Sequence, residues 1–291
     1  MPPPECLQRF DNLNVWKRGS ERAPHKPLLV LYALGRWQNG ETRIAFRTAS
    51  PVLTELLRDF GPQRKSYHPE LPFWHLQSDG VWELGTELTM RPSGSALKRR
   101  LLESDTTGSL AADVLEALHA DPTLAGEIAN RILEGHFPQS LHADILDRVG
   151  LNADLVIARR KKRDPRFRNH VLTAYEYRCA VCGFDLRLGN VTVGLEAAHI
   201  RWHQAAGPDT TDNGLALCSI HHKIFDLGVF TLSEDRLVVV SDQANGSEGL
   251  ESVLLRFQGH PIREAQKQEW LPDARFIEWH RREVFKGDAR G

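Results

Sequence analysis

Apolar residues recur at helical spacing in long stretches of the N-terminal half. The clearest run spans residues 27–37, and Pro27 can occupy the first turn of that helix because no backbone N–H is needed there. Residues 50–59 and most of residues 110–151 follow the same period, with Gly and Pro residues between the runs. The first half of the chain is therefore predicted to be mainly helical.

Shorter apolar segments favour strands. Residues 73–76 and 81–84 flank the pair Asp79-Gly80, a pattern typical of a β-hairpin. Because aromatic residues in such segments usually pack in a core, we expect Trp74 and Trp82 to be buried packing residues.

The second half combines strand-like and helical patterns. Residues 191–199 and 215–218 are strand-like, and a helix follows them, so this region predicts a strand–loop–strand–helix unit. Further on, residues 237–241 predict a strand and residues 270–285 a C-terminal helix.

The length of the chain favours two domains. It has 291 residues, with 41% hydrophobic and 26% charged residues, which is ordinary for a globular protein. We expect one domain over residues 1–155 and a second over residues 156–291. The N-terminus shows no basic segment followed by an apolar run, and no span of about 20 apolar residues occurs, so we expect a cytoplasmic protein.

The net charge of the chain is only -1, but one segment is strongly basic. Residues 159–168 contain seven basic residues and the single acidic residue Asp164. Such a run is compatible with a solvated linker and equally with contacts to nucleic-acid phosphates.

Two pairs of metal-ligating residues lie in the second half. Cys179 and Cys182 are separated by two residues, and so are Cys218 and His221. Together they make a tetrahedrally complete Cys3His set, and a closed set of four ligands indicates a structural Zn2+. A redox CxxC motif is the alternative for the first pair, but it leaves the second pair unexplained.

Three further polar residues lie on the strand–loop–strand–helix unit. His199 ends the first strand, Asn213 precedes the second strand, and His222 lies on the helix. His222 should point about 100° away from His221 and therefore not share the zinc. A set of ordinary polar residues around a zinc knuckle is the alternative interpretation.

This stretch resembles an HNH endonuclease of the ββα-metal type with a zinc knuckle. The likeness covers about residues 166–230 and rests on the sequences EAAHI, DNGLALC and HHKIFD. It implies that His199 is the catalytic general base, that Asn213 fixes the loop and the orientation of the base, and that His222 ligates a catalytic Mg2+ or Mn2+. Phosphodiester hydrolysis needs an activated water and a cation, which agrees with these roles.

One position departs from that family. Many members carry Asp or His directly before the general base as a second metal ligand, whereas this chain has Ala198. The open candidates for the second ligand are Asp226, Asn213 and Glu196. Asp226 could instead cap its helix, and Glu196 could buttress the site through Arg201.

The N-terminal half resembles a second family. The sequence KRGSERAPHKPLLVLYAL and a later loop with SYHPELPFW are similar to the sulfur-binding domain of phosphorothioate-dependent, McrA-type restriction endonucleases, which couple it to a C-terminal HNH domain. The likeness covers about residues 1–155. The implied fold class is α+β, with an N-terminal mixed α/β DNA-binding domain, a helical linker and a C-terminal ββα-metal HNH domain with a zinc knuckle.

The resemblance implies a shallow pocket for the sulfur that replaces a non-bridging phosphate oxygen. Because sulfur is larger and more weakly hydrated than oxygen, apolar side-chain surface should select it. The ring of His68, Pro69 and the stem of Arg22 are the expected walls. The full set of expected DNA- and sulfur-binding residues is Arg22, His25, Lys26, Tyr67, His68, Pro69, Arg91, Ser93, Gly94 and Ser95.

The two resemblances imply a modification-dependent, type IV-like restriction endonuclease. It would recognise phosphorothioated double-stranded DNA and hydrolyse phosphodiester bonds nearby. Since a duplex has two strands and each chain has one active site, a homodimer is expected. A non-catalytic sensor of modified DNA and an HNH nuclease that reads another mark, such as methylcytosine, are the alternatives.

Overall fold

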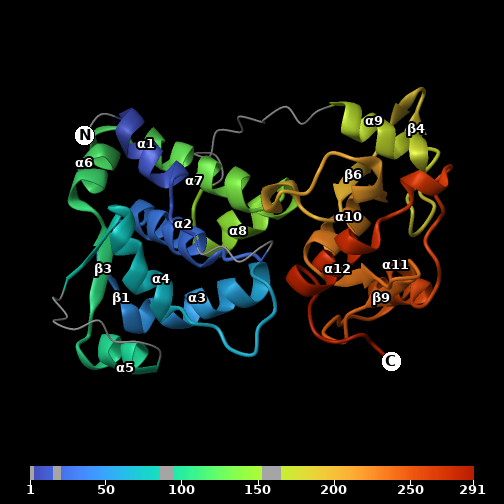
Figure 1. Ribbon diagram of the computed structural model, residues 1–291. Coiled ribbons are helices and arrows are strands. Elements are labelled where there is room, and N and C mark those ends of the chain that lie inside the picture. Colours follow the sequence, from blue (N-terminus) through green and yellow to red (C-terminus); the bar gives the residue numbers. More distant parts are fainter. Residues whose placement is uncertain (1–2, 16–20, 86–94, 153–164) are drawn as a thin grey trace. The chain divides into compact units, whose positions relative to one another are not determined.

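The computed structural model describes residues 3–15, 21–85, 95–152 and 165–291 (Figure 1). The chain forms two compact units. The described residues of the first unit are 3–15, 23–85 and 95–152, and those of the second are 21–22 and 165–291. Within these described ranges, no helix is long and apolar enough to cross a membrane.

The described residues of the first unit form mainly helices and one small sheet. The helices and 3-10 turns are α1 (Pro3–Asp11), α2 (His25–Gln38), α3 (Phe46–Phe60), α4 (Glu70–His75), η1 (Leu76–Asp79), α5 (Ser95–Glu103), α6 (Ala112–Ala120), α7 (Thr123–His136), η2 (Gln139–Leu141) and α8 (His142–Val149). The antiparallel sheet has the order β1 (Ile44–Ala45), β3 (Thr107–Leu110), β2 (Trp82–Leu84).

Helix α2 is the centre of the first unit. All its residues from Lys26 to Gly35 are buried, because α2 packs against α3, α4, α7 and α8. The buried helix predicted for residues 27–37 is confirmed, with two further residues at its start and one at its end. Its N-terminal end lies beside the loop after α3, since a Cβ on Gly61 would be 3.4 Å from the ring of Pro24.

The predicted hairpin of residues 73–84 is wrong in its first half. Residues 70–79 are helical, and only residues 82–84 form a strand. Pro69 and Pro72 stand at the start of α4, where the absent N–H groups cost nothing. Trp82 is a core residue as expected: its Nε1 donates to the carbonyl of Phe73 at 2.9 Å.

The second unit contains short helices and three two-stranded antiparallel sheets within its described residues. The helices and 3-10 turns are α9 (Pro165–Ala174), η4 (His203–Ala205), η5 (Thr211–Asn213), α10 (Ser219–Asp226), α11 (Glu248–Val253), η6 (Leu255–Phe257), η7 (Gln268–Trp270) and α12 (Ala274–Glu283). The strand pairs are β4 (Arg187–Leu188) with β5 (Val191–Thr192), β6 (Leu195–His199) with β7 (Gly214–Cys218), and β8 (Phe230–Leu232) with β9 (Val238–Val240).

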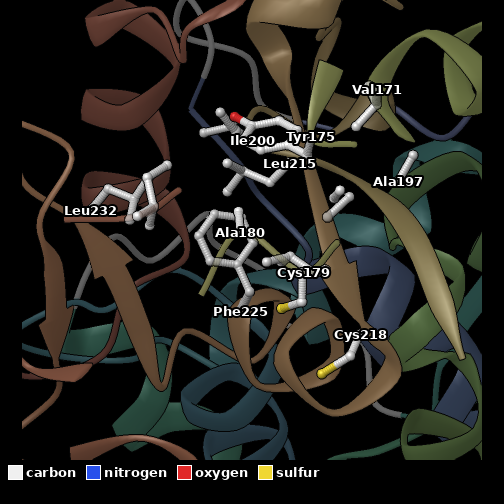
Figure 2. Close-up of a cluster of buried hydrophobic side chains, with 14 of the residues drawn as sticks. Val171, Tyr175, Cys179, Ala180, Ala197, Ile200, Leu215, Cys218, Phe225 and Leu232 are labelled. Atoms are coloured by element: carbon white, nitrogen blue, oxygen red, sulfur yellow. The ribbon is translucent and has the colours of Figure 1, made fainter. Parts of the chain in front are cut away.

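Strands β6 and β7 and helix α10 form the predicted strand–loop–strand–helix unit. Residues 195–199 pair with residues 214–218 along their whole length. Helix α9 packs against both strands, and α10 follows β7 directly. Figure 2 shows the core beneath them, in which Cys179 and Cys218 lie among buried side chains that include Phe225 and Ala180.

Candidate functional site

Three cysteines and one histidine meet in the second unit. The ligand atoms of Cys179, Cys182, Cys218 and His221 all lie within 4.8 Å of one another. Nδ1 of His221 is 3.1 Å from Sγ of Cys218 and 3.7 Å from Sγ of Cys179. Such separations fit donors around a single tetrahedral zinc ion, because a Zn–S bond measures about 2.3 Å. The structure thus brings the four predicted ligands together.

The tautomer of His221 suits a metal ligand. Its Nε2 lies 2.9 Å from the carbonyl oxygen of Val253, and a carbonyl can only accept, so Nε2 carries the hydrogen. Nδ1 is then the lone-pair atom, and it faces the cysteine sulfurs. A backbone carbonyl that fixes the ring in this way is a common partner of zinc-ligating histidines.

A tight turn positions the first two cysteines. The N–H of Gly183 donates to the carbonyl of Cys179, and Gly183 has a φ of +75°, a conformation that favours glycine. The N–H of Ala180 donates to the carbonyl of Ala216 in β7. These bonds tie the cysteine turn to the strand that ends at Cys218.

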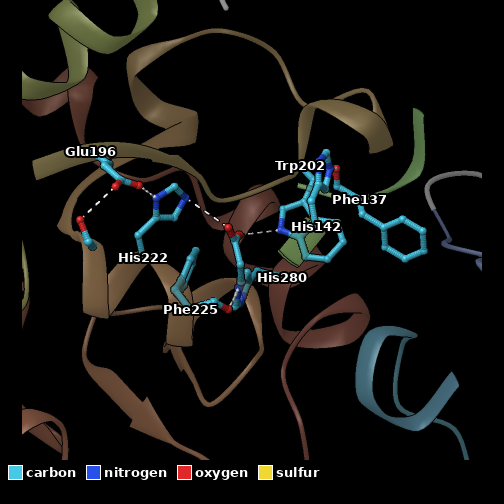
Figure 3. A network of polar contacts seen from close by, with 9 residues as sticks. Phe137, His142, Glu196, Trp202, His222, Phe225 and His280 are labelled. Atoms are coloured by element: carbon cyan, nitrogen blue, oxygen red, sulfur yellow. Dashed lines mark hydrogen bonds and ion pairs between the residues drawn. The ribbon is translucent and has the colours of Figure 1, made fainter. Parts of the chain in front are cut away.

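His222 has partners entirely different from those of His221. Its Nδ1 is 2.6 Å from Oε2 of Glu196, and its Nε2 is 3.2 Å from Oδ2 of Asp226 (Figure 3). Burial lowers the pKa of His222, but the carboxylates of Asp226 and Glu196 raise it more, to about 9. The ring is therefore held between two carboxylates.

The two carboxylates differ in their surroundings. Asp226 is buried, and its Oδ1 accepts a hydrogen bond from Nε1 of Trp202 at 3.0 Å. Glu196 lies on β6 with a half-exposed side chain, and its Oε1 accepts from the hydroxyl of Ser219 at 3.0 Å. The guanidinium of Arg201, expected as a partner of Glu196, donates to the carbonyl of Ala205.

His199 is the last residue of β6 and is held on two sides. Its ring stacks on Phe167 of α9, with the ring centroids 4.0 Å apart and an interplanar angle of 13°. Its Nε2 is 2.7 Å from Oδ1 of Asp209. Sequence reasoning missed Asp209, because the loop contains two similar aspartates, Asp209 and Asp212, and only the folded loop shows which one reaches His199.

Asn213 fixes the loop that follows His199. It is fully buried; its Oδ1 accepts from the N–H of Arg201 at 2.8 Å, and its Nδ2 donates to the carbonyls of Arg201 and Pro208. The loop passes so close that a Cβ on Gly207 would be 1.8 Å from the carbonyl oxygen of Arg201. The loop can therefore close only around a glycine at this position.

In the first unit, the loop after α3 meets the N-terminus of α2. His25 begins α2, and burial, followed by the charges of His68 and Arg64, lowers its pKa to about 4. His68 is exposed, and its ring contacts Ser66 at 3.0 Å and Glu70 at 2.9 Å. Sequence reasoning did not single out Arg64.

The remaining predicted DNA-binding residues differ in exposure and in their place in the first unit. Pro69 is buried at the start of α4, and Tyr67 is partly exposed beside it. Lys26 forms a largely buried salt bridge with Asp79. Ser95 is the first residue of α5, and Arg91, Ser93 and Gly94 lie outside the described residues.

Arg22 belongs to the second unit. Its guanidinium carbon lies 3.8 Å from the ring centroid of Trp202, and the guanidinium donates to the carbonyl of Glu283 at 2.9 Å. Its N–H also donates to the carboxylate of Glu283. These contacts engage the guanidinium of Arg22, which was expected to lie near the phosphate charge at the sulfur pocket.

Two family models match the chain. Residues 3–154 match the model described as a ScoMcrA-like DNA sulfur-binding domain. Residues 179–233 match the model of an HNH endonuclease. A comparison with curated proteins finds no match.

Several solved structures are similar to the chain. The sulfur-binding domain of SprMcrA complexed with phosphorothioated DNA is 22% identical, with a TM-score of 0.46, covering 52% of this chain and 95% of that chain. The type IV phosphorothioation-dependent restriction endonuclease ScoMcrA is 19% identical, with a TM-score of 0.42, covering 51% of this chain and 32% of that chain. The modification-dependent TagI restriction endonuclease is 25% identical, with a TM-score of 0.30, covering 44% of this chain and 41% of that chain.

Proposed function

Because the chain belongs to the ScoMcrA-like DNA sulfur-binding domain family, we propose that it recognises phosphorothioated double-stranded DNA and cuts the DNA nearby. Its HNH endonuclease domain makes it a metal-dependent DNA nuclease. The observation that carries the proposal is the presence of both domains in one chain. A nuclease domain that recognises little DNA sequence by itself needs a second domain to direct it to its target. It would act where cellular DNA is found, in the cytoplasm.

In the proposed reaction, His199 takes a proton from the water that attacks the phosphodiester. Phe167 and Asp209 hold its ring, and the Asp209 carboxylate stabilises the imidazolium that forms. Asn213 maintains the loop between His199 and Asp209. When bound at His222, a Mg2+ or Mn2+ ion supplies the positive charge that stabilises the developing negative charge on the phosphate.

The Cys3His set is proposed to hold Zn2+ as a structural ion. It has four protein donors, which complete a tetrahedral shell and leave no position for a substrate. Its role would be to join the cysteine turn to the start of α10, and so to place His222.

For DNA recognition, we propose that the loop after α3 and the N-terminus of α2 form the sulfur pocket. The ring of His68, Pro69 and Tyr67 supply apolar surface beside His25. With its lowered pKa, His25 is neutral near pH 7 and would contribute a hydrogen bond rather than a charge. Lys26, Arg91, Ser93, Gly94 and Ser95 are proposed as flanking contacts to phosphates and base edges.

One experiment tests this function directly. Duplexes of the same sequence, with and without a phosphorothioate, are assayed for binding and for cleavage in Mg2+, Mn2+ or chelator. We expect tighter binding of the modified duplex and cleavage that requires the metal. Equal affinities for the two duplexes would contradict the proposed recognition, and cleavage in chelator would contradict the proposed chemistry.

We further propose that the protein acts as a homodimer, because each chain offers a single His199 and a duplex has two strands. The hairpin β4–β5 provides a surface for the second copy. Four aliphatic side chains, all exposed, share one face of this hairpin. They are Leu186, Leu188, Val191 and Val193.

The opposite face of the hairpin is polar and packs on its own unit. Arg187 lies over the ring of Tyr177, and Arg168 donates to Thr192. The outward face therefore carries no charge that would favour a DNA phosphate. A second copy presents the same uncharged face, so the two faces are complementary in an isologous contact.

A further inference from the structure

The catalytic ion of the proposed nuclease needs a second protein ligand that position 198 does not provide. Ala198 has no ligand atom, and it is fully buried in β6. Side chains alternate along a strand, so Glu196 points to the same side of β6 as Ala198. That side faces α10, since Glu196 contacts both Ser219 and His222. A longer side chain two residues earlier can thus reach the space next to His222.

Asn213 is not available as that ligand. Its amide oxygen accepts the N–H of Arg201, and both bonds of its amide nitrogen go to backbone carbonyls. All three contacts lie within the loop that it closes, and the residue is fully buried. Turning the amide toward an ion would leave buried backbone groups unpaired.

Asp226 is arranged to orient the histidine. Its carboxylate is 2% exposed, one oxygen accepts from Trp202, and the other lies 3.2 Å from Nε2 of His222. An imidazole that binds a metal through one nitrogen commonly donates the N–H of the other nitrogen to a carboxylate. Nε2 of His222 and Asp226 fit this arrangement, which leaves Nδ1 for the ion.

Glu196 faces that remaining nitrogen. Its Oε2 is 2.6 Å from Nδ1 of His222, its side chain is 48% exposed, and Ser219 fixes its other oxygen. Carboxylate oxygens are the ligands that Mg2+ prefers, and partial exposure leaves room for the waters that Mg2+ keeps. His221 shows the same division of its ring, with Nε2 on a fixed acceptor and Nδ1 on the metal side.

We propose that Glu196 and Nδ1 of His222 are the protein ligands of the catalytic divalent ion, and that Asp226 is a positioning residue that holds Nε2–H of His222. This inference rests on the proposed nuclease function and deepens it. The second ligand therefore comes from two positions before Ala198 on the same side of the strand, instead of from position 198 itself.

The test measures metal binding by the full zinc-loaded chain without DNA. Mn2+ affinity is measured by electron paramagnetic resonance for the wild type, Glu196→Gln and the control Glu234→Gln, an exposed carboxylate in the turn between β8 and β9. We expect Glu196→Gln to weaken Mn2+ binding by at least about tenfold, and the control to leave it unchanged. Zinc content, measured in parallel, reports on folding. Unchanged Mn2+ affinity in Glu196→Gln would overturn the proposal.

A second measurement tests which ring nitrogen of His222 binds the ion and which one stays protonated. In a Mg2+ titration of protein with 15N-labelled histidine, the Nδ1 resonance of His222 should shift while Nε2 stays protonated. A shift at Nε2 with a protonated Nδ1 would overturn this assignment. Because neither measurement uses DNA, a Glu196-dependent ion site in a protein that ignores phosphorothioated duplexes would contradict the proposed recognition alone.

Discussion

The rings of His221 and His222 leave adjacent positions of α10 about 100° apart. That angle sends His221 toward three sulfurs and His222 toward two carboxylates. Each ring has a fixed acceptor at Nε2, the carbonyl of Val253 for His221 and the carboxylate of Asp226 for His222. Two candidate metal sites can therefore lie close together on α10 with separate sets of ligands.

At the residue scale, His199→Ala should abolish cleavage and preserve binding. Loss of a general base costs typically 100-fold or more in rate. Cleavage of a phosphorothioated duplex should fall by at least that factor, while its affinity stays within about twofold. His260→Ala, which removes an exposed histidine of the same unit, is the control. A cleavage rate within tenfold of wild type would contradict the role of His199.

His280 predicts a pH dependence of stability. It is fully buried; Thr231 donates to its Nδ1, and its Nε2 donates to the carbonyl of Phe225, so the neutral ring is satisfied. Burial lowers its pKa to about 3. Since the unfolded chain titrates near pH 6.5, the stability that His280 provides is present above pH 6.5 and is lost as the pH falls below that value.

The expected loss between pH 6.5 and 4.5 is roughly 2 kcal/mol from this residue. It is measured as the pH dependence of the unfolding transition of the second unit in the full chain. His280→Gln should be less stable at pH 7 and should show a smaller decline over the same interval. An identical decline in both proteins would show that another group titrates.

At the scale of elements, α10 connects the two candidate metal sites. The helix begins directly after Cys218 and ends at Asp226. Strand β6 supplies Glu196 and His199, and its pairing with β7 sets the position of both relative to α10. The geometry of the candidate nuclease site therefore depends on how the cysteine turn fixes the start of α10.

Removal of zinc should destabilise the second unit. Cys182→Ser, or a strong chelator, should remove one zinc per chain and lower the melting temperature of that unit by roughly 10 °C, because a structural zinc stabilises only the folded state. The matched control is Cys6→Ala, which changes the remaining cysteine, a buried residue of α1. Zinc content by elemental analysis and thermal unfolding are the measurements, and a zinc-loaded Cys182→Ser protein with unchanged melting would refute the prediction.

At the scale of the whole molecule, the apolar face of β4–β5 should mediate dimerisation. Leu188→Glu places a charge in the most exposed position of that face, and its burial in a dimer would be strongly unfavourable. Sedimentation should show a monomer at concentrations where the wild type and the control Ser104→Glu are dimers. The monomeric Leu188→Glu protein should nick one strand of a phosphorothioated duplex more often than it cuts both strands. A Leu188→Glu protein that remains dimeric but loses affinity for DNA would assign the face to DNA instead.

Helices α2, α3 and α12 could be anticipated from the apolar patterns of residues 27–37, 50–59 and 270–285. The conformation of residues 73–79 could not be anticipated, because a short apolar run with aromatic residues fits a strand or a helix equally well by its period. In the folded chain, Phe73 and Leu76 are both buried on the helical segment, and Trp82 packs against Phe73. The packing of α4 against Trp82 and α2 therefore decided between helix and strand for these residues.

By itself the sequence determined the candidate ligands and the candidate catalytic histidines, because ligand spacing and motif order are local properties of a chain. Cys179, Cys182, Cys218 and His221 meet as their spacing predicts. Only the tertiary structure decided which acidic side chains outside α10 approach the histidines, namely Asp209 at His199 and Glu196 at His222. Those contacts join residues 10 and 26 positions apart, and strand pairing and loop closure, which no local pattern encodes, bring them together.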